Sequence, residues 1–220
     1  MPFRGWPTAA HDFYVGLESD NSKAFWSANK AVYDESVRAP MEALSAEVED
    51  EFGPLHVFRP YRDVRFSKDK TPYKTAIGAV TEGEGGESYY VQFSAEGLFV
   101  GSGYYMMARD QLDRFLRAVA DDHTGPPLVA IVDDLRAAGY EIGGTALKTA
   151  PRGYPKDHPR VELLRHKGLF VGKTCPSGKW LSTRAALGRI TGIWRDASPA
   201  NAWLNAQVGP STAAPPDAED

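Results

Sequence analysis

Apolar residues recur at helical spacing through the first quarter of the chain. The pattern predicts one helix over residues 8–18, a second that begins after Asn21 or Ser22, and a third from Pro40 to Phe52. Proline suits the first turn of that third helix because its missing N–H has no partner there in any case. The third helix presents one apolar face, made by Met41, Leu44, Val48 and Phe52.

The period then changes to the alternation typical of strands. Short strands are predicted over residues 55–58, 64–66 and 75–81. The clearest β-hairpin joins residues 88–94 to residues 98–105 through Ala95-Glu96-Gly97. Further on, helices are predicted over 112–119, 128–135, 159–166, 181–195 and 200–208, and strands over 140–143 and 168–174.

This order of elements predicts an α+β fold, with a mainly antiparallel sheet, N-terminal helices and further helices packed on it. Without an internal repeat or an interdomain linker, residues 1–208 are expected to form a single domain. Residues 209–220 combine prolines, small residues and acids, and we expect a disordered acidic tail there.

Composition narrows the class of protein. In 220 residues, 42% are hydrophobic, yet no apolar run reaches the roughly 18–20 residues of a membrane helix, so we expect no membrane partner. A single cysteine excludes an intramolecular disulfide and a cysteine-rich zinc site. Residues 1–10 hold one basic residue and no apolar core of a secretion signal, so we expect a reducing, cytoplasmic location.

The near balance of 25 basic and 29 acidic residues hides a segregation of charge. Residues 34–51 hold seven acids and one base, whereas residues 59–74 hold six bases and two acids. Residues 148–173 hold seven bases and two acids. Runs of this kind are often solvated surface, but two basic segments distant in sequence can also meet in a fold as one positive patch.

The first basic segment is the densest source of candidate chemistry. Guanidinium groups donate two parallel hydrogen bonds, which suits phosphate or carboxylate. The alternative is an exposed β-edge that lysine and proline protect against aggregation. The candidate ligand-binding residues here are Arg59, Arg62, Arg65, Lys68, Lys70, Tyr73 and Lys74.

The second basic segment holds a stiff loop between Pro151 and Pro159. Tyr154 and Arg160 are its candidate ligand-binding residues. His158 adjoins the carboxylate of Asp157 and is the candidate for acid–base catalysis, the role to which a histidine side chain is suited in general. The alternative is a structural anchor for the loop.

No sequence motif points to a cofactor or a metal, and we predict neither. Gly101-Ser-Gly103 lacks the third glycine of a dinucleotide fingerprint. No His-x-x-x-His spacing occurs. Cys175 is expected to be a small buried residue rather than a nucleophile.

Several runs together resemble the domain of unknown function 2461 family, from about His11 to Trp203. The resemblance implies one recognisable unit and favours a site at the two basic segments, but the family carries no established activity. The runs are Phe25-Trp26-x-x-Asn29, the whole of 59–75, Gly101-x-Gly-Tyr104 and Pro151-Arg-Gly-Tyr-Pro-Lys-Asp-His-Pro-Arg160.

Two functions follow from these observations. The first is binding of a small anionic, phosphate- or carboxylate-bearing ligand, with or without catalysis, where the two basic segments meet. The alternative is a nucleic-acid-binding or protein-interaction module on the same surface, which the acidic total and the missing RNA- and DNA-binding signatures disfavour. The sequence identifies neither a reaction nor an oligomeric state.

Overall fold

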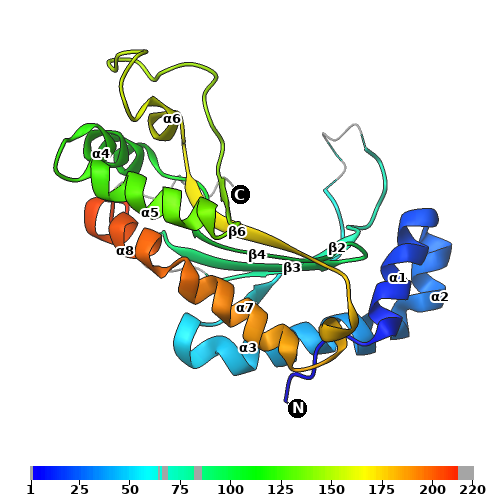
Figure 1. Cartoon of the computed structure of the whole chain (residues 1–220). Coiled ribbons are helices and arrows are strands. Elements are labelled where there is room, and N and C mark those ends of the chain that lie inside the picture. Colours follow the sequence, from blue (N-terminus) through cyan, green and yellow to red (C-terminus); the bar gives the residue numbers. More distant parts are fainter. Residues whose placement is uncertain (1, 64, 66–68, 82–85, 213–220) are drawn as a thin grey trace. The chain divides into compact units, whose positions relative to one another are not determined.

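The computed structural model, which describes residues 2–63, 65, 69–81 and 86–212, contains a six-stranded antiparallel sheet (Figure 1). Its strand order is β1-β2-β3-β4-β6-β5, and helices precede it in the chain, so the predicted α+β class is confirmed. The strands are β1 His56–Val57, β2 Ala76–Val80, β3 Ser88–Ser94, β4 Gly97–Tyr104, β5 Glu141–Gly143 and β6 Leu169–Pro176.

The predicted hairpin is β3 and β4, which are neighbours in the sheet. β2 pairs with β3 in a register that sets Ile77 opposite Phe93 and Ala79 opposite Val91. All four side chains are buried. Because alternate side chains of a strand point to opposite faces, a slip of one residue would expose this buried set, and its burial therefore fixes the register. The strand predicted over 64–66 lies mostly outside the described residues, and the described Arg65 belongs to no strand.

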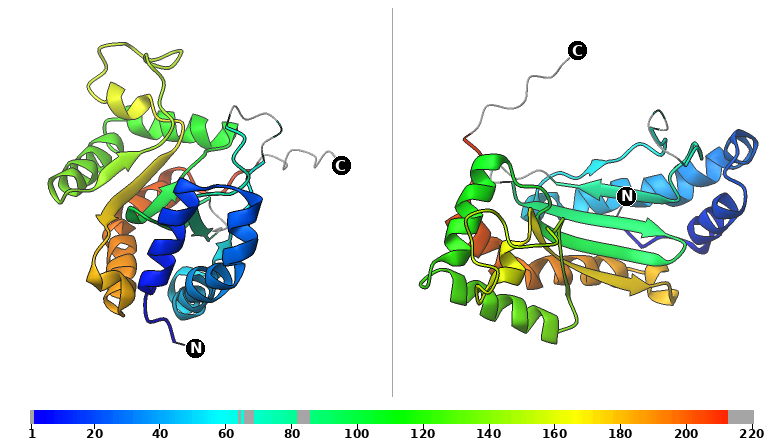
Figure 2. Two further views of the ribbon diagram at one scale, coloured as in Figure 1. Left: turned by 90° about the vertical axis from the view of Figure 1, so that its right-hand side faces the viewer. Right: turned by 90° about the horizontal axis from the view of Figure 1, so that it is seen from above.

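The helix predicted over residues 181–195 is divided into a 3₁₀ helix and an α-helix, and no π-helix was predicted over residues 33–38. Apart from these two differences, the described helices match the predicted ones in place, with shifts at their ends. They are α1 Thr8–Ser19, α2 Lys23–Val32, the π-helix η1 Tyr33–Arg38, α3 Ala39–Phe52, α4 Arg109–Ala120, α5 Gly125–Ala137, α6 Val161–Leu164, the 3₁₀ helix η2 Lys179–Ser182, α7 Ala185–Asp196 and α8 Ser198–Gln207. One difference matters for the site: α2, η1 and α3 follow one another without a break, as the ribbon shows from two further sides in Figure 2.

The chain divides into two compact units. The first comprises the described residues of 1–81, 89–100 and 174–193, and the second those of 82–88, 101–173 and 194–220. The single domain expected over residues 1–208 stays a prediction.

Aromatic side chains build the core of the first unit. The Trp6 ring stacks on Phe93, with centroids 5.0 Å apart, and the Trp26 ring stacks on Tyr73 at 4.2 Å. The four apolar residues predicted on the face of α3 are all buried. Cys175 is buried as well, as expected.

The second unit has its own apolar core, to which α4, α5, α6 and α8 contribute. The Trp203 ring meets Phe115 edge-on at 6.2 Å, and its indole N–H donates to the Thr124 carbonyl at 2.8 Å. No helix among the described residues combines the length and the apolar character that crossing a membrane requires.

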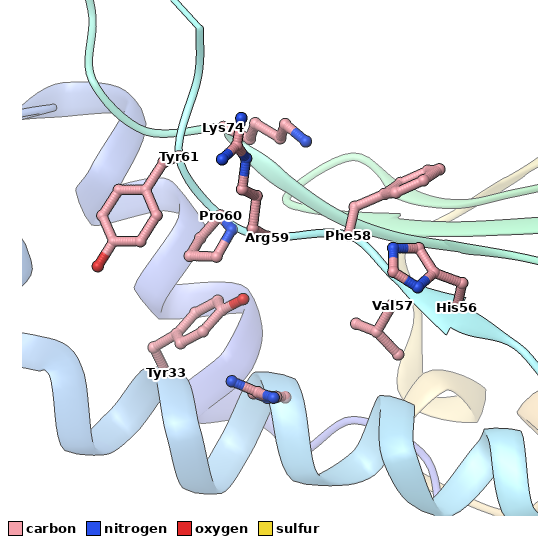
Figure 3. Close-up of a pocket in the computed structure, with 9 residues that line it drawn as sticks. Tyr33, His56, Val57, Phe58, Arg59, Pro60, Tyr61 and Lys74 are labelled. Carbon is pink, nitrogen blue, oxygen red and sulfur yellow. The ribbon is translucent and has the colours of Figure 1, made fainter. Parts of the chain in front are cut away.

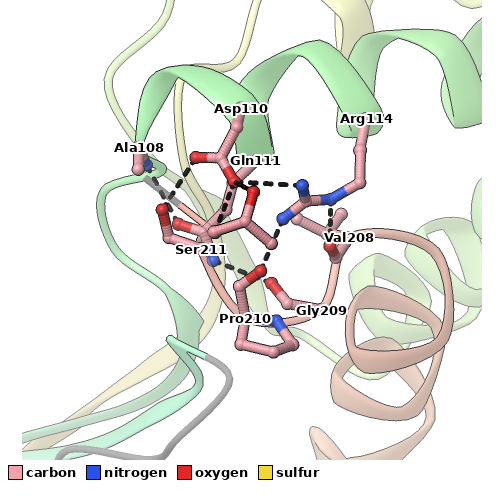
Figure 4. A network of polar contacts seen from close by, with 9 residues as sticks. Ala108, Asp110, Gln111, Arg114, Val208, Gly209, Pro210 and Ser211 are labelled. Atoms are coloured by element: carbon pink, nitrogen blue, oxygen red, sulfur yellow. Dashed lines mark hydrogen bonds and ion pairs between the residues drawn. The ribbon is translucent and has the colours of Figure 1, made fainter. Parts of the chain in front are cut away.

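The described end of the chain lies against α4 (Figure 4). The Asp110 carboxylate accepts hydrogen bonds from the Ser211 hydroxyl and the Thr212 N–H, both at 2.8 Å. The Arg114 guanidinium donates to the carbonyls of Val208 and Pro210. Residues 209–212 of the predicted tail are therefore held by side chains of α4, and residues 213–220 lie outside the described chain.

Candidate functional site

A cavity of about 500 Å³ lies in the first unit, between η1 and the segment that begins with β1 (Figure 3). We call it the Arg59–Lys74 cavity. Aromatic and cationic side chains predominate in its lining, and no carboxylate is among the lining residues that the structure describes. The lining residues are Tyr33, Arg38, His56, Val57, Phe58, Arg59, Pro60, Tyr61 and Lys74.

The π-helix η1 supplies one wall. Hydrogen bonds in a π-helix join residues five apart, as the bond from the Ala39 N–H to the Asp34 carbonyl does here. Tyr33 and Arg38 are also five residues apart, so this winding brings both to the same side of the helix. Local π-helical turns are frequent at functional sites, because they redirect side chains that an α-helix would spread around its axis.

Tyr33 presents a protonated phenol to the cavity. Figure 3 shows its hydroxyl pointing toward the segment that carries Arg59. Burial, which disfavours the charged phenolate, raises the pKa of Tyr33 to about 12, and the nearby positive charge of Arg38 offsets only part of this effect. The hydroxyl is therefore available as a hydrogen-bond donor at neutral pH.

The opposite wall depends on a short stretch of antiparallel pairing. Tyr61 pairs with Tyr73 in an isolated β-bridge, and the Lys74 N–H donates to the Pro60 carbonyl at 2.8 Å. These contacts close the base of the loop between the two tyrosines. Arg59 and Lys74, which are 15 residues apart in sequence, consequently line the same cavity.

Tyr73, predicted to bind ligand, anchors this loop in the core. It is buried, and its ring stacks on Trp26. The Asn21 side chain both donates to the Tyr73 carbonyl and accepts from its N–H, each at 3.0 Å. Tyr73 thus fixes the position of the neighbouring Lys74, and direct contact of Tyr73 with a ligand stays a prediction.

The cavity concentrates positive charge. Within the described chain, neither Arg59 nor Lys74 has a carboxylate within the 4.0 Å of an ion pair. Burial lowers the pKa of Lys74, and the charges of Arg59 and Arg62 lower it further. The third cation of the lining, Arg38, is already paired with Glu42 at 2.7 Å.

Other cations of the first basic segment have partners of their own. Arg62 forms an ion pair with Asp69, and Arg65 forms one with Asp63 at 2.7 Å. The hydrogen bonds from Arg65 hold the pKa of Asp63 at about 2. Neither arginine lines the cavity, and their predicted ligand-binding roles stay predictions.

Two further lysines of this segment, Lys68 and Lys70, were predicted to bind ligand, and these roles stay predictions. Lys70 is exposed and is not among the lining residues. Lys68 lies outside the described residues.

The second basic segment belongs to the second unit, where Arg160 holds a helix end. Its side chain, only 9% exposed, donates to the carbonyls of Val119 and Ala120, each at 2.6 Å, and pairs with Asp122 at 2.7 Å. Val119 and Ala120 are the last two residues of α4, whose carbonyls have no partners within the helix. Arg160 therefore has a structural use, and its predicted ligand contact stays a prediction.

The proposed catalytic pair makes local contacts as well. His158 Nδ1 accepts the Arg160 N–H at 3.0 Å, so the proton of the neutral imidazole lies on Nε2. Among the described residues, Asp157 and His158 share no hydrogen bond. Tyr154 packs at the side of the apolar core, and burial raises its pKa. The joint site of the two segments, which belong to different units, stays a prediction.

Of the nine lining residues, the sequence identified Arg59 and Lys74 as ligand-binding and missed the other seven, which are Tyr33, Arg38, His56, Val57, Phe58, Pro60 and Tyr61. His56 and Phe58 carried a usable signal, since a strand over 55–58 places alternate residues on one side. No sequence pattern indicated the π-helical turn. Within the described chain, no three His, Cys, Asp or Glu residues are grouped so that they could hold a metal ion.

Comparison with known proteins identifies the family but no function. Residues 9–203 match the family described as Conserved hypothetical protein (DUF2461). The chain therefore belongs to this family, which confirms the resemblance seen in the sequence. No curated protein and no solved structure matches the chain.

Proposed function

We propose that this member of the DUF2461 family binds a small anionic ligand, bearing a phosphate or a carboxylate, in the Arg59–Lys74 cavity. The observation that carries the proposal is the presence of two cations, Arg59 and Lys74, in one cavity whose described lining residues include no carboxylate. A guanidinium offers paired hydrogen bonds in a plane, and an ammonium adds a compact charge. The two together suit an oxyanion.

Electrostatics support an anionic occupant. The lowered pKa of Lys74 means that its surroundings disfavour the charged ammonium. An anion near Lys74 and Arg59 would offset the repulsion between the two cations and favour the charged form again. The Tyr33 hydroxyl, which belongs to the lining of the same cavity, supplies a neutral donor, because a phenol with a raised pKa is fully protonated at neutral pH.

The proposal keeps the contributions predicted for the second segment. Tyr154 and Arg160 remain candidates for ligand contact, and His158 with Asp157 remains the candidate for catalysis. A cytoplasmic location also belongs to the proposal, on the argument that the lone thiol of Cys175 suits a reducing compartment.

Isothermal titration calorimetry with inorganic phosphate and with acetate, at low ionic strength, tests the proposal. We expect Arg59→Gln and Lys74→Met each to weaken binding of the preferred anion by about 10- to 100-fold, the worth of one charge-assisted hydrogen bond. Arg4→Gln and Lys23→Met are matched controls, because both side chains are exposed and lie outside the lining. Their affinities should stay within about twofold of the original chain.

Two results would overturn the proposal. One is the absence of heat from either anion at millimolar concentration. The other is an equal loss of affinity in the cavity variants and the control variants, which would indicate a diffuse effect of net charge. A polymer such as RNA that binds with a steep salt dependence, and that loses affinity in the same cavity variants, would support the nucleic-acid alternative instead.

A further inference from the structure

We infer that the ligand of the Arg59–Lys74 cavity is a phosphate monoester that carries an aromatic ring. This inference rests on the proposed function, because it assumes that the cavity binds an anion. It adds to the proposed function the chemical class of the part of the ligand that is not its anionic group. Three features of the cavity carry it: its size, its rings and its count of unpaired charges.

The cavity is larger than an inorganic anion needs. A water molecule takes about 30 Å³ in the liquid, so a phosphate ion with four oxygens takes on the order of 100 Å³. The cavity measures about 500 Å³, which falls within the roughly 300–1,000 Å³ typical of sites for whole small molecules. A ligand that fills it has a body besides its anionic group.

Besides the cations, aromatic rings form much of the wall of the cavity. The aromatic side chains of the lining are those of Tyr33, His56, Phe58 and Tyr61. Aromatic side chains favour a planar ring in an offset or edge-on arrangement, beyond the benefit of burying its area. The body of the ligand is therefore best matched by a ring.

Tyr61 is the ring best placed to receive that body. It is 49% exposed, so a large part of its surface is free to contact a ligand. Trp26 lies 6.0 Å from its ring centroid and Tyr73 lies 5.6 Å from it. The two buried rings support Tyr61, so that it presents to the cavity a surface already held in position.

The charge count favours a phosphate ester over a carboxylate. Arg59 and Lys74 together offer two positive charges, whereas Arg38 is already paired with Glu42. A phosphate monoester carries a charge of roughly −1.5 to −2 at pH 7, which matches both cations, and a carboxylate would match only one. In the described part of the chain the lining offers no acid to receive an ammonium group, so a zwitterionic ligand such as an amino acid fits poorly.

Calorimetric comparison of two phosphate esters tests the inference. We expect phenyl phosphate to bind about tenfold more tightly than ethyl phosphate. In Tyr61→Leu this ratio should fall below about threefold, and Tyr61→Phe, which keeps the ring, should retain it. Tyr105→Leu is the matched control, since Tyr105 is 66% exposed and is not among the lining residues. The ratio of the two affinities is a useful readout, because a general loosening of the fold lowers the affinity for both esters by the same factor and leaves the ratio unchanged.

The outcomes separate the inference from the proposed function. Equal affinities for the two esters, with phosphate still bound through Arg59 and Lys74, would overturn the aromatic ligand and leave the anion site standing. A ratio that survives in Tyr61→Leu would overturn the assigned ring contact. Failure of phosphate and of both esters to bind would overturn the inference and the proposed function together.

Discussion

Removal of the Arg160 guanidinium is expected to destabilise the second unit strongly. In Arg160→Met the carbonyls of Val119 and Ala120, at the end of α4, lose a charged donor at 2.6 Å each. Methionine retains much of the apolar stem, so the substitution isolates the hydrogen bonds from the packing. The bonds also place a cation at the C-terminus of a helix, where the helix dipole favours it.

The magnitude follows from the three contacts. Each hydrogen bond to a charged group is worth about 1.5–3 kcal/mol, which gives an upper range of about 3–6 kcal/mol for the two carbonyls. The ion pair with Asp122 adds little, because that carboxylate is 89% exposed and remains solvated. Water will reach the freed carbonyls in part, so we expect a loss of about 3 kcal/mol.

Urea unfolding followed by tryptophan fluorescence measures this loss. With a slope of about 2 kcal/mol per molar urea, the midpoint should fall by about 1.5 M. Arg152→Met is the matched control, because Arg152 is an exposed arginine of the same loop, and it should change stability by less than about 0.5 kcal/mol. A loss in Arg160→Met no larger than in the control would refute the reasoning.

Three further predictions follow from individual contacts. Asp110→Asn should speed hydrogen exchange of the Thr212 amide by about tenfold or more, because it replaces the charged acceptor of that amide by a neutral one. Mass spectrometry measures this exchange, and an unchanged rate would contradict the contact. NMR titration should find the Asp63 carboxyl half-protonated at about pH 2, and Arg65→Gln should move that pKa back toward 3.8. Because the pKa of Asp63 is depressed in the folded state, the Asp63–Arg65 pair contributes stability above about pH 4 and loses it as the pH falls toward 2. A titration midpoint of Asp63 near 3.8 in the original chain would contradict the pair. Gly125→Ala should cost about 1–3 kcal/mol in urea unfolding, because its Cβ would lie 2.3 Å from the Val119 carbonyl oxygen, and a loss below about 0.5 kcal/mol would contradict that packing.

The sequence predicted the regular parts of the fold because their residues follow a single period. The face of α3 repeats at helical spacing, and all of its members are buried. The hairpin of β3 and β4 alternates, and Val91 and Phe93 point into the core as expected. The turn from α2 to α3 could not be predicted, because a π-helix differs from an α-helix only in winding and leaves no compositional mark.

The candidate site was predictable only in part. The charge run indicated Arg59 and Lys74, because their residue types and clustering suit an anion. It could not separate these from Arg62 and Arg65, whose carboxylate partners lie within seven and two residues of them. Charge alone also could not reveal that Arg160 supports a helix end, since a donor to backbone carbonyls and a donor to a ligand look the same in sequence.

The most direct test of the anion site is a crystal structure of the full chain grown with phosphate at saturating concentration. The account predicts a tetrahedral anion in the Arg59–Lys74 cavity, within hydrogen-bond distance of both the Arg59 guanidinium and the Lys74 ammonium. A cavity that holds only water under those conditions, with both side chains ordered, would contradict it.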